Sequence, residues 1–132
     1  MLGMQKILII EDDQELSRMY ERAFRLSGYE VELAFDGKEA IEKVTHTPEK
    51  PALILLDILI PTVSGLDVLR TIKQDENSKQ IPVIVLTNSF KKENADLFLS
   101  LGASLYLVKM DHDPKHIVQK VNQFLEAANS KA

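Results

Sequence analysis

Cysteine is absent from the 132 residues of this chain, and no run of five or more basic residues occurs in it. The lack of cysteine excludes disulfides, thiolate metal sites and a cysteine nucleophile. Because nucleic acids are bound by clustered Lys and Arg, and the formal net charge is -4, we expect no direct nucleic-acid binding. No apolar run approaches the length of a membrane span, and the first residues lack a signal-peptide layout. We therefore expect no membrane association and a cytoplasmic location.

The length and composition are those of a single globular domain. Hydrophobic residues make up 45% of the chain and charged residues 27%, which is ordinary for a folded protein. No internal repeat, low-complexity tract or interdomain linker divides the sequence. We therefore expect one domain over residues 1–132, with its core in about residues 5–128.

Segments of strand length alternate with segments of helical periodicity along the whole chain. Short apolar or alternating runs predict strands at residues 7–10, 30–33, 53–56, 82–86 and 105–108. Apolar residues recur at helical spacing between and after these runs. Capping and terminating signals mark the helix ends at Asp13, Gly28, Ser64, Gly102 and Asp113-Pro114. The last helix is expected to give way to a fraying tail at residues 129–132.

This alternation predicts a doubly wound α/β fold, in which five parallel strands are joined by right-handed crossovers and covered by five helices on both faces. Polar and apolar residues alternate in residues 30–33, so this strand is expected at a sheet edge. Ligands of an open parallel sheet bind beyond the carboxyl ends of its strands. The residues that directly follow the strands are therefore the candidate site.

Polar side chains follow four of the predicted strands. They are Glu11, Asp12 and Asp13 after the first, Asp57 after the third, Thr87 after the fourth and Lys109 after the fifth. Acidic oxygen donors without His or Cys favour a hard cation, and Mg²⁺ fits best. A metal, an ammonium and a hydroxyl around a carboxylate favour phosphoryl transfer. Asp57 would then be the nucleophile and would form an aspartyl-phosphate.

Each of these residues also has a purely structural interpretation. Asp13 is expected only to cap the following helix, and Asp57 taken alone is more typical of a cap or turn. Thr87 alone carries little information, and Lys109 alone is typical of a solvated edge charge. The chemical interpretation depends on the coincidence of these residues at four successive strand ends.

In these segments the chain resembles the receiver domain of two-component response regulators, over essentially all of residues 5–128. The resemblance is carried by Ile-Leu-Ile-Ile-Glu-Asp-Asp at residues 7–13, Leu-Leu-Asp-Ile-Leu-Ile-Pro at 55–61 with Gly65, Val-Leu-Thr at 85–87 and Tyr-Leu-Val-Lys at 106–109. It implies a flavodoxin-like sheet of strand order 2-1-3-4-5, in a chemotaxis-regulator-like receiver that is either a single-domain protein or excised from a longer one. It also implies a regulatory domain rather than an enzyme.

The resemblance implies a role for each residue of the site. Asp57 would accept a phosphoryl group from a phosphohistidine of a sensor histidine kinase or a histidine phosphotransfer protein. Glu11 and Asp12 would hold Mg²⁺ together with Asp57 and the backbone carbonyl of Leu59. Lys109 would contact the phosphoryl group.

A conformational switch is implied as well. Thr87 would close onto the phosphoryl group, and Tyr106 would turn inward as Thr87 moves. The face formed by the fourth helix, the fifth strand and the fifth helix, roughly residues 92–128, would then bind a downstream target or a second copy of the chain. On composition alone, Tyr106 is instead interpreted as a strand aromatic packed against the last helix.

Four positions bear on how this chain would differ from the family. Asn88 stands where a small residue usually follows the threonine. Met110 replaces the usual proline after the lysine, which leaves the loop at residues 110–113 less constrained. Leu59 and Ser89 flank the expected phosphoryl site. We expect both to alter spontaneous dephosphorylation by changing the access of the attacking water.

Two other functions remain open at this point. Phosphatases of the haloacid dehalogenase type carry a second Asp two residues after the nucleophile, and here that residue is Leu59. A receiver-like module that binds partners without phosphorylation is expected to lack part of the acidic pocket, which this chain keeps. His46, His112 and His116 match no zinc motif, are expected to be exposed and are not candidate phosphodonors.

Overall fold

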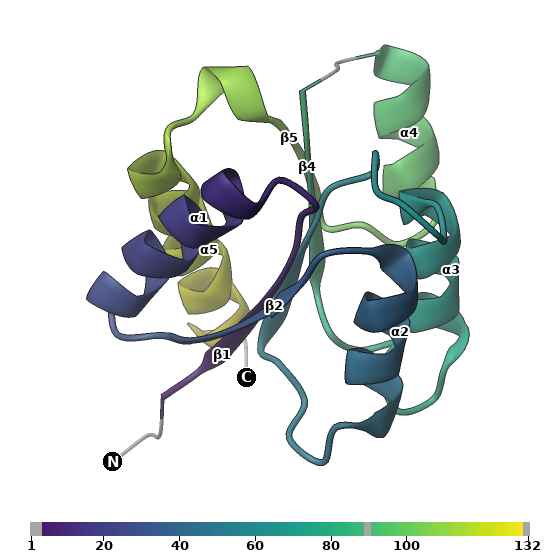
Figure 1. The fold of residues 1–132 in the computed structure, drawn as a ribbon, viewed down its shortest axis with the longest axis horizontal. Helices are drawn as coiled ribbons and strands as arrows, with labels where there is room; N and C mark the ends of the chain where they lie inside the picture. The colour runs from purple at the N-terminus through teal and green to yellow at the C-terminus, as the bar shows by residue number, and fades with distance from the viewer. Residues whose placement is uncertain (1–3, 89–90, 131–132) are drawn as a thin grey trace.

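The computed structural model describes residues 4–88 and 91–130. A five-stranded parallel sheet of order β2-β1-β3-β4-β5 lies between two layers of helices (Figure 1). The strands are β1 (Lys6–Ile10), β2 (Glu30–Ala34), β3 (Leu53–Leu56), β4 (Val83–Thr87) and β5 (Leu105–Val108). The helices are α1 (Gln14–Leu26), α2 (Gly37–His46), α3 (Gly65–Gln74), α4 (Lys92–Ser100) and α5 (Pro114–Ser130), and a short 3-10 turn, η1 (Lys109–Asp111), follows β5. The predicted fold and strand order are confirmed.

The burial of each strand follows from its place in the sheet. Every residue of the central strands β3 and β4 is buried, which explains their unbroken apolar sequences. β2 lies at the edge and leaves Glu30 exposed and Glu32 half-exposed, as its alternating sequence predicts. The register places Ile10 beside both Ala34 and Leu56, so β1, β2 and β3 end at the same level.

Alternate strand residues build a separate core on each face of the sheet. α1 and α5 cover one face, where Ile7 and Ile9 pack with helix residues such as Phe24 and Val121 (Figure 1). α2, α3 and α4 cover the other face, where Leu8 and Ile10 belong to a core that includes residues of these three helices. This period-two alternation is what a strand buried on both faces requires. Because helices cover both faces, a ligand can approach the sheet only at the ends of its strands.

The helix ends agree with the sequence signals, with one exception. The side chains of Asp13 and Ser64 accept hydrogen bonds from backbone N–H groups in the first turns of α1 and α3. Gly28, with φ of 94°, follows the end of α1. The expected fraying at residues 129–132 is wrong for its first two residues, because α5 continues through Asn129 to Ser130. Residues 129 and 130 are neither Gly nor Pro, so the helix meets no stop signal there.

None of the helices within residues 4–88 and 91–130 has the length and apolar character of a transmembrane span.

Candidate phosphoryl and metal site

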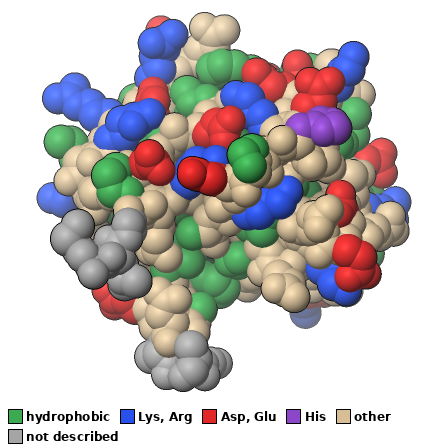
Figure 2. Space-filling model, turned by 90° about the horizontal axis from the view of Figure 1, so that it is seen from below, with side chains coloured by type: hydrophobic (Ala, Val, Ile, Leu, Met, Phe, Trp, Pro, Cys, Tyr) green, Lys and Arg blue, Asp and Glu red, His purple; other side chains and the backbone are tan. Residues whose placement is uncertain are grey.

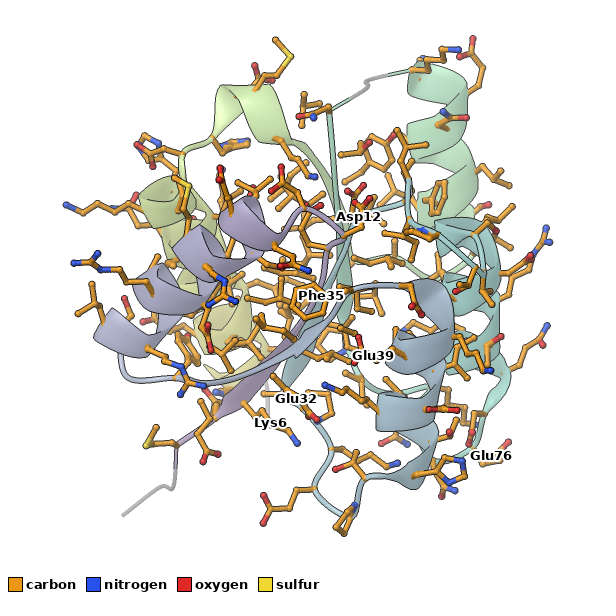
Figure 3. The ribbon with its side chains drawn as sticks, in the orientation of Figure 1. Lys6, Asp12, Glu32, Phe35, Glu39 and Glu76 are labelled. Atoms are coloured by element: carbon orange, nitrogen blue, oxygen red, sulfur yellow. The ribbon has the colours of Figure 1, made fainter. Side chains whose placement is uncertain are left out.

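The predicted site residues converge at the carboxyl end of the sheet. Glu11 and Asp12 directly follow β1, Asp57 follows β3 and Lys109 follows β5. Figure 3 shows Asp12 at this end, whereas Lys6 and Glu32 lie together near the opposite end. Figure 2 presents that opposite end, where basic side chains lie among acidic ones.

Lys109 joins the two buried carboxylates of the site. Its Nζ lies 2.8 Å from Oδ2 of Asp57 and also contacts Oε1 of Glu11. The side chains of Lys109, Asp57 and Glu11 are only 9%, 7% and 3% exposed. A buried carboxylate needs a counter-charge, and this ammonium provides it for both. Lys109 is thus not a solvated charge at the sheet edge, which is what this residue taken alone had indicated.

The backbone around the site holds Glu11 in place. Its side chain accepts a hydrogen bond from the N–H of Asp13, and its carbonyl accepts one from the hydroxyl of buried Ser17. Burial raises the pKa of Glu11 from 4.5 to about 7, and the nearby charge of Asp57 adds to this against the lowering effect of Lys109. Glu11 therefore changes its charge near neutral pH.

The same network raises the pKa of Lys109 above its ordinary value. Burial alone would lower this pKa, but hydrogen bonds to Asp57 and Glu11 outweigh the effect of burial. The ammonium therefore stays charged throughout the range in which Glu11 titrates.

Three carboxylates form a possible cation site. One carboxylate oxygen from each of Glu11, Asp12 and Asp57 lies within 4.8 Å of the other two. Asp12 is exposed, so this cluster opens to solvent on one side. A set of carboxylate oxygens without His or Cys suits a hard cation that keeps some of its water ligands, such as Mg²⁺. The donor set therefore fits the predicted metal.

These residues line an open cavity of about 300 Å³. Its lining consists of Glu11, Asp12, Asp13, Leu16, Asp57, Leu59, Asn88 and Lys109. Leu59 is held by its backbone N–H, which donates to Oδ1 of Asp57 at 3.1 Å, and the residue is 67% exposed. Asn88 lines this cavity from the end of β4, and Ser89 lies outside the described residues. This volume lies at the lower end of the range for small-ligand sites.

The two predicted switch residues lie on neighbouring strands. Thr87 is fully buried at the end of β4, and Tyr106 is half-buried in β5. The Tyr106 ring centroid lies 6.1 Å from that of Phe98 in α4, and the ring packs against the core on the α4 side of the sheet. The alternative interpretation, in which Tyr106 packs against the last helix, is therefore wrong. β5 directs this residue to the other face.

A short 3-10 turn begins at Lys109, with Met110 at the position where proline was expected. Residues 109–111 form η1, and the N–H of His112 donates to the carbonyl of Lys109. Met110 is exposed on this turn. His46 and His116 are exposed as expected, but His112 is half-buried because the turn brings it against the start of α5.

Sequence reasoning missed three residues of α1 that adjoin the site. Leu16 lines the cavity, Ser17 bonds the carbonyl of Glu11, and Tyr20 is buried beneath Glu11 and Asp57. Burial raises the pKa of Tyr20 to about 12. The available signal was helical spacing. Leu16, Ser17 and Tyr20 lie three, four and seven residues after the cap residue Asp13, which places them on one face of the helix.

The sequence matches the response regulator receiver domain family over residues 7–122. The response regulator ArlR of Staphylococcus saprophyticus is 32% identical over 128 residues, which are 97% of this chain and 56% of ArlR. The transcriptional regulatory protein CpxR of Escherichia coli is 32% identical over 126 residues, which are 96% of this chain and 51% of CpxR. The chain thus spans about half the length of these curated relatives.

Solved structures give the same result. A CheY-like receiver domain protein from Methanospirillum hungatei has a TM-score of 0.88 at 25% identity, covering 98% of this chain and all of that one. The Mn²⁺-bound form of response regulator Rcp1 has a TM-score of 0.81 at 31% identity, covering 91% of this chain and 93% of Rcp1.

Proposed function

The chain belongs to the family of response regulator receiver domains, and we propose that its Asp57 accepts a phosphoryl group from a phosphohistidine. The observation that carries this proposal is the buried Asp57 carboxylate, with Lys109 at 2.8 Å and the carboxylates of Glu11 and Asp12 beside it. The donor would be a sensor histidine kinase or a histidine phosphotransfer protein. We place the protein in the cytoplasm and treat residues 1–132 as one receiver domain.

The transfer step uses the Asp57 carboxylate as the nucleophile. One of its oxygens bonds to phosphorus while the phosphorus–nitrogen bond to the donor imidazole breaks, and the imidazole recovers a proton as it leaves. Lys109 is positioned to neutralise charge on the phosphoryl oxygens because its Nζ already lies at Asp57. The hydroxyl of Thr87 would donate a hydrogen bond to one of these oxygens. The product is an aspartyl-phosphate.

Glu11, Asp12, Asp57 and the backbone carbonyl of Leu59 would hold Mg²⁺. The bound cation would supply positive charge that neutralises the transferring group. Support comes from the all-oxygen cluster and from the Mn²⁺-bound form of Rcp1, to which this chain is 31% identical. Because a ligating carboxylate must be ionised, the raised pKa of Glu11 would make cation affinity depend on pH near 7.

The output would be a population shift in the α4–β5–α5 face. Phosphorylation would favour the conformation in which Thr87 contacts the phosphoryl group and Tyr106 turns inward. Contact between the rings of Tyr106 and Phe98 supports this route, because it joins β5 to α4. The face would bind a downstream target or a second copy of the chain.

The alternative functions have less support. At the position where a haloacid dehalogenase phosphatase carries its second Asp, this chain has the exposed, apolar Leu59. A phosphorylation-independent binding module has no need for Lys109 buried between two carboxylates, because that arrangement carries a desolvation cost. We therefore propose a regulatory domain with only self-phosphorylation and slow self-dephosphorylation.

Intact-mass measurement after incubation with a small phosphodonor tests the proposal. Acetyl phosphate with Mg²⁺ is expected to add one phosphoryl group to the parent protein, and chelation of the metal is expected to prevent this. Asp57→Asn should abolish the addition, whereas the matched control Asp67→Asn, at an exposed carboxylate in the first turn of α3, should retain it. Equal phosphorylation of the parent and Asp57→Asn would overturn the proposal.

NMR spectra test the switch separately. Beryllofluoride with Mg²⁺ is expected to shift the signals of Thr87 and Tyr106 in the parent protein but not in Asp57→Asn. Unchanged signals in the parent protein would contradict the switch.

A further inference from the structure

The loop between β3 and α3 reaches its tip at Thr62, whose backbone has φ of 69°. Among the described residues, Thr62 alone has a positive φ without being glycine. Left-handed backbone is unfavourable for a β-branched side chain and suits Gly or Asn far better. A specific contact of the threonine side chain is therefore needed to explain its presence.

The hydroxyl of Thr62 fastens this loop to the first turn of α2. It accepts a hydrogen bond from the N–H of Lys38 at 3.0 Å and donates one to Oδ1 of Asp36 at 3.2 Å. The carbonyl of Pro61 adds a third bond by accepting from the N–H of Gly37 at 3.0 Å. We call these three hydrogen bonds the latch. Figure 1 shows the loop before α3 passing beside the start of α2.

The start of α2 is itself firmly built, so it offers the loop a fixed partner. Asp36 caps the helix by accepting from the N–H of Glu39, and Glu39 accepts from the N–H of Phe35. Figure 3 shows Phe35 and Glu39 together at this end of α2. Gly37 permits the close approach, because a Cβ there would lie 2.2 Å from the carbonyl oxygen of Val63.

The segment fixed by the latch contains Leu59, between Asp57 and Thr62. At the base of the loop, the N–H of Gly65 donates to the carbonyl of Ile58, and Gly65 has no room for a Cβ. Leu59 is 67% exposed, so packing of its side chain provides little anchorage. The Leu59 peptide is therefore positioned by the base of the loop, by its bond to Asp57 and, at the tip, by the latch.

We propose that Thr62 is a positioning residue, which holds the backbone carbonyl of Leu59 where a divalent cation at the Asp57 cluster requires it. This inference rests on the proposed function, because it assumes that this carbonyl is a metal ligand. Mg²⁺ demands near-ideal octahedral geometry, so a carbonyl on a looser loop binds it less well. Residues that orient metal ligands affect affinity without touching the metal.

Three variants separate the latch from ordinary stability. Thr62→Ser keeps both hydroxyl bonds, and its affinity for Mg²⁺ should stay within about twofold of the parent. Thr62→Gly removes the hydroxyl but is favoured at this φ, so it should remain folded while losing roughly three- to tenfold in affinity. The control is Thr47→Gly at the opposite end of α2, where the hydroxyl bonds the carbonyl of Glu49, and its affinity should not change.

The experiment is an NMR titration with Mg²⁺ alone, combined with hydrogen exchange of the Leu59 amide in metal-free protein. Exchange is expected to be several-fold faster in Thr62→Gly than in Thr62→Ser. Equal Mg²⁺ affinity in Thr62→Gly and the parent would overturn the positioning role. If the parent protein bound no Mg²⁺, the proposed metal site would fail, and unchanged Leu59 exchange in Thr62→Gly would then also refute the latch.

Discussion

Replacing Glu11 by Gln is expected to stabilise the metal-free protein above neutral pH. The glutamine keeps the shape of the side chain and one acceptor oxygen for Lys109, but its NH2 group replaces the oxygen that accepts from the N–H of Asp13. The folded-state pKa of Glu11 is raised from 4.5 to about 7, mainly by burial. A group with a raised pKa contributes stability that is fully present below about pH 4.5 and lost as the pH rises through 7.

The magnitude follows from the size of the shift. A shift from 4.5 to about 7 is a penalty of about 3 kcal/mol on the ionised form, and most of this penalty appears between pH 5 and pH 8. Lys109 adds no pH dependence in this window because its own pKa is raised. The hydrogen bond from the N–H of Asp13 is lost at every pH and costs about 1 kcal/mol, so Glu11→Gln should be more stable than the parent by about 2 kcal/mol at pH 8, with a much smaller difference at pH 5.

The assay is urea unfolding at pH 5, 6, 7 and 8 in the presence of a chelator. The difference between variant and parent cancels the titration of groups remote from Glu11, which leaves the contribution of Glu11 and its direct neighbours. Mg²⁺ should stabilise the parent more than the variant, because the variant lacks one ligand carboxylate. The same dependence of stability on pH in both proteins would refute the assignment of Glu11 as the group that titrates near 7.

Three further substitutions test other parts of the account. Lys109→Met leaves two buried carboxylates without their ammonium, so urea unfolding at pH 8 should show a loss of about 3 kcal/mol and a smaller loss at pH 5. Gly65→Ala would place a Cβ 2.4 Å from the Cα of Ile58, and thermal unfolding should show destabilisation of about 2 kcal/mol or more. Leu59→Asn replaces an exposed apolar side chain beside Asp57, and the lifetime of the phosphorylated protein should change; an unchanged lifetime would show that this side chain does not control water access.

The architecture was predictable because the apolar runs, the helix-end signals and the alternation of strands with helices all indicate the same fold. The apolar runs at residues 53–56 and 83–86 have no polar alternation, as strands covered on both faces require. Parallel strands end at one side of the sheet, and this topology brings Glu11, Asp57 and Lys109 together without any contact being known in advance. The strand ends therefore sufficed to locate the candidate site.

Features that depend on side-chain packing were not predictable in the same way. From its spacing, Tyr20 is predicted to be an ordinary core residue of a helix. Its position next to Glu11 and Asp57 depends on how α1 packs against the sheet. The left-handed backbone of Thr62 has no signal in its residue type, since Gly or Asn would be expected there. The end of α5 was placed too early because a polar composition alone does not stop a helix.

The central claim is that Asp57 itself carries the phosphoryl group. Borohydride reduces an aspartyl-phosphate to homoserine, so peptide mapping after phosphorylation with acetyl phosphate and Mg²⁺ identifies the modified carboxylate. Homoserine at position 57 alone, lost when the metal is chelated, is the result that the account predicts. Homoserine at position 12 or 13, or unmodified Asp57 in a protein that has taken up phosphate, would contradict it.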